Sequence, residues 1–289
     1  MSKIALILTT LFFATSAFGQ YATRLELQKN NFIIGEPVLA TITITNRSGA
    51  DVIVGGVGAR PWLQFQMEEG SGRVLPPVSV GSKDAIKLPA GGTTRHTVEI
   101  EGNASTSTLG TFYTTASIYH PISGQYYATN RARITVMDAK PMFDEGYGVP
   151  SGFASAGRAR RYQCIIFRDV DSIQLYARIV DERTREYIAT QYLGPVAASL
   201  QPQISIDNKN KLQILFMVQQ HYFCHTTIDP DGKVAKRSYY SDLDGASRPN
   251  LVMTKDGARI AGGEFFDPAK PPPSKGTGIR KVSERPKGL

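Results

Sequence analysis

The chain has 289 residues, of which 41% are hydrophobic, and a formal net charge of +8 at pH 7. Residues 21–138 hold 10 basic and 9 acidic residues, residues 139–268 hold 16 and 15, and residues 269–289 hold 6 and 1. The basic excess therefore lies in the last segment, which is rich in Pro and Gly. Nucleic-acid binding by the folded part is not supported, because a binding groove needs its positive charge on a structured surface.

Residues 1–19 have the parts of a secretory signal peptide. Lys3 gives a positively charged start, residues 4–13 form an apolar run, and Ala17 and Gly19 frame a small-residue cleavage site. This run is shorter than the ~20 residues that span a bilayer, and no cysteine follows the cleavage site. We expect a secreted or periplasmic mature chain that begins at Gln20 and has neither a lipid anchor nor a transmembrane segment.

Residues 20–138 alternate between apolar and polar side chains in short segments. In the clearest one, residues 32–46, Val38, Ala40, Ile42 and Ile44 fall on one face, and Leu39 and three threonines on the other. Period-two alternation predicts a strand with one buried face. Similar segments lie at 25–28, 52–54, 62–67, 97–101, 112–119 and 131–136. Seven short strands separated by turn residues predict an antiparallel β-sandwich.

Four motifs stand out here: Phe-Ile-Ile-Gly-Glu-Pro-Val at 32–38, Ile-Thr-Ile-Thr-Asn at 42–46, Leu-Pro-Ala-Gly-Gly at 88–92 and Gly-Thr-Phe-Tyr at 110–113. With them, residues 20–138 resemble a bacterial immunoglobulin-like domain of exported proteins. A proteinase-inhibitor family and macroglobulin-type domains share this look. The resemblance implies an immunoglobulin-like sandwich and little about activity.

Trp62 is the only tryptophan, and strand alternation places it opposite Leu63. It is either a partly covered residue beside the loop at 55–60, or an aromatic platform for a sugar or a protein partner, together with Tyr113 or Tyr119. We favour the first interpretation, because scattered exposed aromatic residues are ordinary.

Residues 139–157, rich in Gly, Pro, Ser and Ala, predict a linker or a long surface loop. Within 158–268, strands without helices are predicted at 162–167, 173–180, 187–193, 203–206, 212–219, 222–228, 234–240, 251–253 and 259–265. The region is thus a second antiparallel β domain, and the whole chain is predicted to be all-β.

An internal repeat runs through this second domain. Residues 202–212 match 249–259 at a shift of 47, and residues 179–183 match 227–231 at a shift of 48. A repeated unit of four short strands with this length is similar to a β-propeller blade. Two units and a fragment are present, whereas closed propellers have ~4–8 blades. Either the units pack as a sandwich, or the first domain or another chain covers their open ends, and homo-oligomers through open β edges are then possible.

Cys164 and Cys224 lie in predicted strands. They either form a disulfide with each other or remain two buried thiols, and the sequence leaves both alternatives open. Residues 269–289 predict a disordered, basic, Pro-rich tail.

Candidate catalytic and metal sites are few. His221 and His225 would lie ~13 Å apart on a strand, too far to share a zinc ion. The Asp-x-Asp motifs at 169–171, 229–231 and 242–244 lack further calcium ligands and are explained by hairpin turns. Neither a nucleophile elbow nor a Ser-x-x-Lys motif is present. We predict no catalytic residues, no metal and no cofactor.

The sequence therefore predicts an exported, non-catalytic binding or scaffold protein that contacts carbohydrate or a protein partner. One alternative is a proteinase inhibitor that acts through a first-domain loop at 55–60 or 70–80. A further alternative is a hydrolase with an unrecognised pair of acidic residues.

Overall fold

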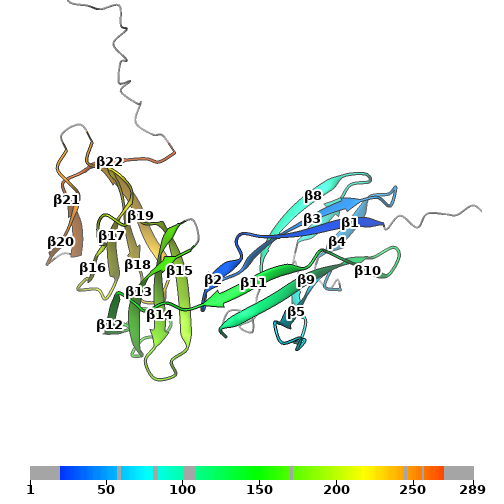
Figure 1. Ribbon diagram of the computed structural model, residues 1–289, viewed down its shortest axis with the longest axis horizontal. Coiled ribbons are helices and arrows are strands. Elements are labelled where there is room, and N and C mark those ends of the chain that lie inside the picture. The colour runs from blue at the N-terminus through cyan, green and yellow to red at the C-terminus, as the bar shows by residue number, and fades with distance from the viewer. Residues whose placement is uncertain are drawn as a thin grey trace, which may run out of the picture. The chain divides into compact units, whose positions relative to one another are not determined.

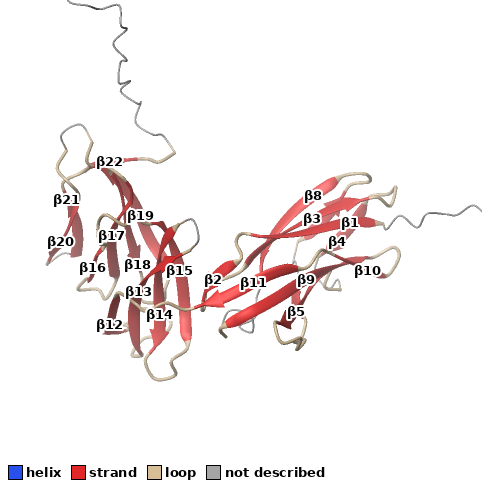
Figure 2. Cartoon of the chain, in the orientation of Figure 1, coloured by secondary structure: helices blue, strands red, loops and turns tan. Residues whose placement is uncertain are grey.

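The computed structural model describes residues 20–56, 60–80, 84–100, 108–169, 172–243, 246–255 and 257–269. All regular elements in these ranges are β-strands, and no helix occurs among them, as Figure 2 shows. The prediction of an all-β chain is confirmed. The predicted signal peptide and residues 270–289 of the predicted tail lie outside the described residues.

Contacts along the chain divide it into two compact units. The first unit comprises Met1–Asn30, Val38–Gly102 and Thr111–Ile134, and the second comprises Asn31–Pro37, Asn103–Gly110 and Thr135–Leu289. The second unit therefore includes a short segment that precedes most of the first unit in sequence.

The first unit is built from two mostly antiparallel sheets (Figure 1). One has the order β1-β3-β8, with β1 (Tyr21–Leu27), β3 (Leu39–Asn46) and β8 (Thr93–Glu99). The other has the order β2-β11-β9-β5-β6, with β11 (Ala132–Met137), β9 (Gly110–His120), β5 (Leu63–Glu69) and β6 (Val78–Val80). Its edge strand β2 (Asn31–Ile33) pairs in parallel with β11, and β10 (Gln125–Ala128) also pairs with β9. A separate pair joins β4 (Val52–Gly55) to β7 (Ala85–Leu88). This division of strands is that of an immunoglobulin-like sandwich, where strands A, B and E oppose C, F and G.

Side-chain alternation fixes which face of each strand is buried. On β3, Ala40, Ile42 and Ile44 are at most 1% exposed, and the threonines between them lie on the outer face. On that outer face, Thr41 and Thr45 pair with Thr97 and Thr93 of β8 through their hydroxyl groups. The predicted strand orientation is therefore correct.

The second unit contains two consecutive antiparallel sheets and a hairpin. The first sheet has the order β12-β13-β14-β15, with β12 (Phe143–Gly148), β13 (Ala159–Arg168), β14 (Ile173–Asp181) and β15 (Tyr187–Pro195). The next has the order β16-β17-β18-β19-β22, with β16 (Gln203–Ile206), β17 (Leu212–Gln219), β18 (Tyr222–Ile228), β19 (Val234–Ser241) and β22 (Glu264–Phe266). β20 (Asn250–Thr254) and β21 (Gly257–Ala261) form the hairpin. One hydrophobic core, which includes Tyr162, Ile179, Phe216 and Ile228, joins the two sheets.

The segments aligned by the sequence repeat occupy corresponding places in the second unit. The matched residues 202–212 contain β16 and the turn into β17, and the matched residues 249–259 contain β20 and the turn into β21. Hydrogen bonds also join residues 47 or 48 apart: Asn208 Nδ2 donates to Lys255 O, Leu251 N to Gln203 Oε1, and Tyr162 Oη to Asn210 O. Residues that meet between neighbouring elements of the second unit are therefore separated in sequence by about the period of the repeat.

The outer faces of the two sheets in the second unit are each packed against another segment of the chain. On the outer face of the first sheet, Ile165, Phe167 and Tyr176 pack with Ile33. Ile33 ends β2 (Asn31–Ile33), which pairs in parallel with the end of β11. We call Asn31–Pro37 the strap. At the other end of this unit, Leu251 and Ile260 of the β20–β21 hairpin pack against Leu215, Met217 and Phe223, and the exposed residues of β20 are Asn250 and Met253.

Several strands differ from the sequence expectation. The short strands β2, β6, β7 and β10 of residues 20–138 were not predicted. Two further differences lie in the second unit. Residues 143–148, inside the predicted linker, form edge strand β12, whose Tyr147 stacks on Tyr162 with ring centroids 3.9 Å apart. The predicted strand at 259–265 is broken at Gly262 and Gly263, which have φ of +74° and +70°. Gly tolerates such a backbone, which ends β21 and lets the chain turn toward β22.

Candidate functional site: a pocket beside Trp62

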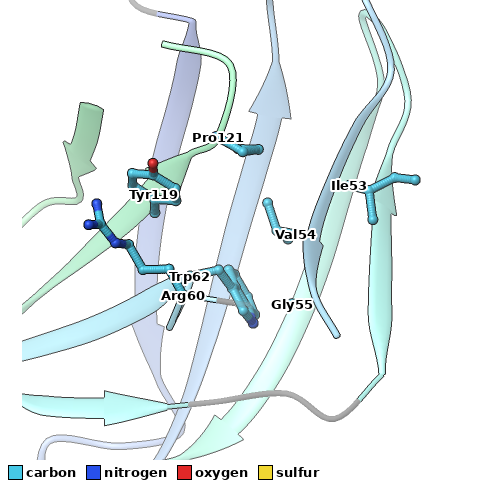
Figure 3. A pocket seen from close by; sticks show the side chains of 7 residues that line it. All are labelled: Ile53, Val54, Gly55, Arg60, Trp62, Tyr119 and Pro121. Carbon is cyan, nitrogen blue, oxygen red and sulfur yellow. The ribbon is translucent and has the colours of Figure 1, made fainter. Parts of the chain in front are cut away.

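A small apolar pocket of about 90 Å³ lies in the first unit. Its lining residues, drawn in Figure 3, are Ile53, Val54, Gly55, Arg60, Trp62, Tyr119 and Pro121. Most of these side chains are apolar, and Arg60 supplies a positive charge at the pocket. The arrangement can hold a small apolar group beside a cation.

Three parts of the chain position the pocket. β4 supplies Ile53, Val54 and Gly55, and the segment just before β5 supplies Arg60 and Trp62. Tyr119 at the end of β9 and Pro121 in the following turn form the third part. The backbone N–H of Tyr119 donates a hydrogen bond of 2.8 Å to the carbonyl of Trp62 and so holds the two aromatic residues side by side. Gly55 has a φ of +76°, which residues with a Cβ rarely adopt.

Trp62 is a core residue, and the expectation that it is only partly covered is wrong. It is 1% exposed, and its ring meets the ring of His96 edge-to-face at 5.4 Å. His96 lies opposite the buried Ile42 in the pairing of β3 with β8, so its side chain is on the core face. Strand alternation misplaced Trp62 because it precedes β5, where the regular pleat has not yet begun.

The indole Nε1–H of Trp62 is buried without a hydrogen-bond partner among the described residues. An unsatisfied buried donor costs ~1–3 kcal/mol. Figure 3 places this nitrogen at the edge of the ring nearest the Gly55 label. The pocket is thus lined by the ring of a tryptophan that has an unused polar atom.

Arg60 is exposed, and its guanidinium carbon lies 5.1 Å from the centroid of the Tyr119 ring. No carboxylate pairs with Arg60 among the described residues. The acidic residue just before β4, Asp51, pairs with Lys87 at 2.7 Å and also accepts a hydrogen bond from the backbone of Ala90. These interactions lower the pKa of Asp51, the hydrogen bond from Lys87 most of all.

Exposed apolar side chains lie at the pocket and next to it in the chain. Ile53 is 62% exposed, and Ile122, which follows Pro121, is 68% exposed. Tyr126 is 40% exposed and lies against Tyr119, with ring centroids 5.2 Å apart. Ile53, Pro121 and Ile122 were not predicted from the sequence, whereas Arg60 ends the loop at 55–60 that was. Ile53 carries a signal that could have found it, because strand alternation between the buried Val52 and Val54 turns it outward.

Of the three predicted binding residues, the structure brings Trp62 and Tyr119 together at the pocket but not Tyr113. Tyr113 lies six residues before Tyr119 on β9, which is ~20 Å in an extended strand. Arg131 stacks on Tyr113 at 3.8 Å and forms an ion pair with Glu68 at 3.0 Å. Tyr113 is therefore part of a separate surface cluster.

The two cysteines are buried, free thiols. Both belong to the core between the first two sheets of the second unit. Burial raises the pKa of the Cys164 thiol far above its ordinary value and also raises that of Cys224. Of the two open alternatives, the structure has two thiols rather than a disulfide.

The histidines at 221 and 225 have separate environments. His221 lies in the turn between β17 and β18 with a φ of +67°, and its Nδ1 is 2.7 Å from Asp242 Oδ1. His225 is 6% exposed and its Nε2 contacts Gln213 Oε1 at 3.0 Å. Burial, together with the charge of Lys236, lowers the pKa of His225 to about 4.

The Asp-x-Asp motif at 229–231 forms a hairpin turn, as predicted. Asp229 Oδ1 accepts hydrogen bonds from the backbone N–H groups of Asp231 and Lys233, and Gly232 has a φ of +92°. The carboxylate of Asp229 thus holds the turn between β18 and β19. The motifs at 169–171 and 242–244 lie partly outside the described residues.

Comparisons with known proteins give no family. No family description matches the chain, and no curated protein matches it. Among solved structures, a CARDB domain from Pyrococcus furiosus is similar over 41% of this chain and 94% of its own, with 10% identity and a TM-score of 0.25. The DNA glycosylase AlkC of Pseudomonas fluorescens is similar over 40% of this chain and 30% of its own, with 11% identity and a TM-score of 0.27. The sporulation control protein Spo0M of Bacillus subtilis is similar over 87% of this chain and 91% of its own, with 10% identity and a TM-score of 0.29. At these TM-scores the similarities support no functional argument.

By its own strand order, the chain is an all-β protein whose first unit is immunoglobulin-like. In the part of the chain that the structure describes, no helix is long and apolar enough to cross a membrane.

Proposed function

We propose that this is an exported, non-catalytic binding or scaffold protein that holds a partner at the pocket of its first unit. The observation that carries the proposal is the gathering of Arg60, Trp62 and Tyr119 around one apolar pocket with an exposed isoleucine beside it. Tyr and Arg, here Tyr119 and Arg60, are among the residue types that contribute most to binding at protein interfaces, whereas the buried Trp62 forms the wall of the pocket. Exposed apolar side chains that gather in one place mark interaction sites.

A protein partner is favoured over a carbohydrate. Sugars stack on an open aromatic face, but the Tyr119 ring is already contacted by Arg60 and by Tyr126, and Trp62 is buried. Ile53 and Ile122 instead offer apolar area that a protein surface can cover.

Export and the scaffold role rest on separate observations. Export is proposed because residues 1–19 have the parts of a signal peptide. For the second unit we propose blade-like repeats in a short stack, supported by hydrogen bonds between residues 47 or 48 apart. The strap at one end and the β20–β21 hairpin at the other serve as caps, which stacked repeats require.

A proteinase inhibitor is the second candidate function. Gly55 and Arg60, the two ends of the proposed inhibitory loop, both line the pocket. Residues 57–59 of this loop lie outside the described residues.

Site-specific photo-crosslinking tests the binding proposal. A photoreactive amino acid is placed at position 122 or, as a control, at Val74, which is 62% exposed elsewhere in the first unit. In the exported fraction of the source organism, we expect one discrete adduct from position 122 and none from position 74. Tyr119→Ala should abolish this adduct, whereas Tyr113→Ala, which changes a tyrosine on the same strand away from the pocket, should not. Equal adducts from both positions, or none from position 122, would refute the proposal.

A protease panel and a glycan array separate the alternatives. Loss of protease activity at stoichiometric amounts of the mature chain would support the inhibitor. Glycan binding that Tyr119→Ala removes would assign a carbohydrate partner instead of a protein.

A further inference from the structure

We infer that the pocket beside Trp62 is a subsite for a short branched aliphatic group that carries a carboxylate. This inference rests on the proposed function, because it specifies the chemistry of the group that the binding site would accept. It is argued from the size of the pocket, the residues that line it and the charge at its rim.

The size of the pocket limits what can enter it. A water molecule occupies about 30 Å³ in the liquid, and a cavity of about 150 Å³ holds benzene. A pocket of about 90 Å³ is therefore large enough for three or four carbon atoms. A benzene-sized ring exceeds it, whereas an isopropyl or isobutyl group fills it.

The lining determines the polarity of that group. Val54, Pro121 and the ring of Trp62 present hydrocarbon surface to the pocket (Figure 3), and Ile53 lies at its outer edge with its side chain turned outward. A hydroxyl or amide among these side chains would lose its hydrogen bonds to water, which disfavours sugars and polar side chains there. A branched aliphatic group loses none.

The charge at the rim determines what lies beside the aliphatic group. Arg60 has no ion-pair partner among the described residues, and its guanidinium lies over the Tyr119 ring. Asp51, the acidic residue just before β4, is engaged by Lys87. Because a guanidinium binds a carboxylate through two parallel hydrogen bonds, an anionic group next to the aliphatic one complements Arg60. Leu or Val at the C-terminus of a protein has this chemistry, and so does a free branched-chain acid.

Titration of the mature chain with small probes tests the inference. Trp62 is the only tryptophan, so its fluorescence and its indole N–H signal in a nitrogen–proton correlation spectrum report on this pocket alone. The probes are 3-methylbutanoate, the isosteric 3-methylbutanol and 3-methylbutylamine, and the larger 3-phenylpropanoate. We expect a saturable change with 3-methylbutanoate at millimolar concentration, about tenfold weaker binding of the alcohol, and no binding of the amine or the aromatic acid.

Arg60→Gln should weaken binding of 3-methylbutanoate about tenfold, to the level of the alcohol, and leave the alcohol unchanged. Arg47→Gln, a change of an exposed arginine elsewhere in the first unit, is the matched control and should have no effect. N-acetyl-Gly-Leu and its C-terminal amide separate the two sources. Binding of the acid but not the amide assigns a protein C-terminus, and binding of 3-methylbutanoate alone assigns a free acid.

The inference is overturned if Trp62 shows no saturable response up to about 50 mM 3-methylbutanoate, if the alcohol binds equally well, or if Arg60→Gln changes nothing. Such results together with a position-122 adduct that Tyr119→Ala removes would leave the proposed function standing. Failure of both experiments would remove the inference and the proposed function together.

Discussion

Gly35→Ala should destabilise the second unit far more than a change of backbone preference alone would. Gly35 lies in the strap and has a φ of +79°, where L-residues pay ~1–2 kcal/mol. A Cβ built on Gly35 would lie 2.8 Å from Thr190 Oγ1 and 2.9 Å from Tyr187 Cβ, both on β15. Carbon contacts are most favourable at about 3.5–4.0 Å, so the strap or β15 must move.

The size of the effect follows from these contacts. Overpacking of this kind costs ~1–3 kcal/mol. Movement of the strap also weakens the hydrogen bond of 3.1 Å from Thr190 Oγ1 to Ile34 O, whose net contribution is ~1 kcal/mol. We therefore expect Gly35→Ala to lower the free energy of unfolding by about 3–6 kcal/mol in total.

Gly157→Ala is the matched control for this measurement. Gly157 belongs to the same unit and has a φ of +80°, but nothing lies within 4 Å of its Cβ position. It should lose only the ~1–2 kcal/mol of backbone strain. Urea unfolding followed by circular dichroism measures both variants. If Gly35→Ala loses no more stability than Gly157→Ala, the strap is not packed against β15 as described.

Three further predictions concern buried polar groups of the second unit. Asp138→Asn removes the charged partner of the buried Arg178, which lies 2.6 Å from Asp138 Oδ1. The variant should lose about 2–3 kcal/mol of stability in urea unfolding. This loss is smaller than for a fully buried pair because the Asp138 side chain is 37% exposed. The free energy of unfolding should fall as the pH drops from about 6.5 toward 4, because His225 becomes protonated in the unfolded chain in that window and stays neutral in the folded chain. The total loss is up to about 3 kcal/mol. His225→Gln should flatten the curve of unfolding midpoint against pH. Cys164 and Cys224 should resist a thiol reagent in the native protein and react rapidly in denaturant, because both are buried.

Each of these has a clear contrary result. An Asp138→Asn variant as stable as one carrying Arg24→Gln, which removes an exposed ion pair with Glu26, would show that Arg178 needs no partner. An unfolding midpoint that stays flat between pH 6.5 and 4 would mean that His225 titrates alike in both states. Rapid thiol labelling without denaturant would mean that the core between the two sheets opens readily.

Much of the fold follows from the sequence because its strands alternate regularly and end at turns. The bounds of β16, β17 and β18 agree with the predicted segments, since turn residues such as Asp207 and Asp229 close each one. β12 escaped prediction because Gly146 and Gly148 interrupt its apolar pattern, and only pairing with β13 makes it a strand. Local pattern cannot supply that pairing.

The candidate site could be predicted only in part. Trp62 and Tyr119 were named because large aromatic residues are rare and noticeable, but the burial of Trp62 depends on His96, which lies 34 positions later and reaches it only in the folded sandwich. The role proposed for Arg60 depends on its having no ion-pair partner among the described residues, which is a property of three-dimensional distances. No spacing in the sequence encodes it.

The strap has a consequence for any attempt to produce the second unit alone. A fragment cut at residue 139 or 158 would lack Ile33, and the side chains of Ile165, Phe167 and Tyr176 would meet water. Such a fragment should aggregate on expression, whereas one with residues 31–37 grafted back through a short flexible linker should remain in solution. During synthesis on the ribosome, the strap emerges well over a hundred residues before β15, so it must wait for its binding site to be made.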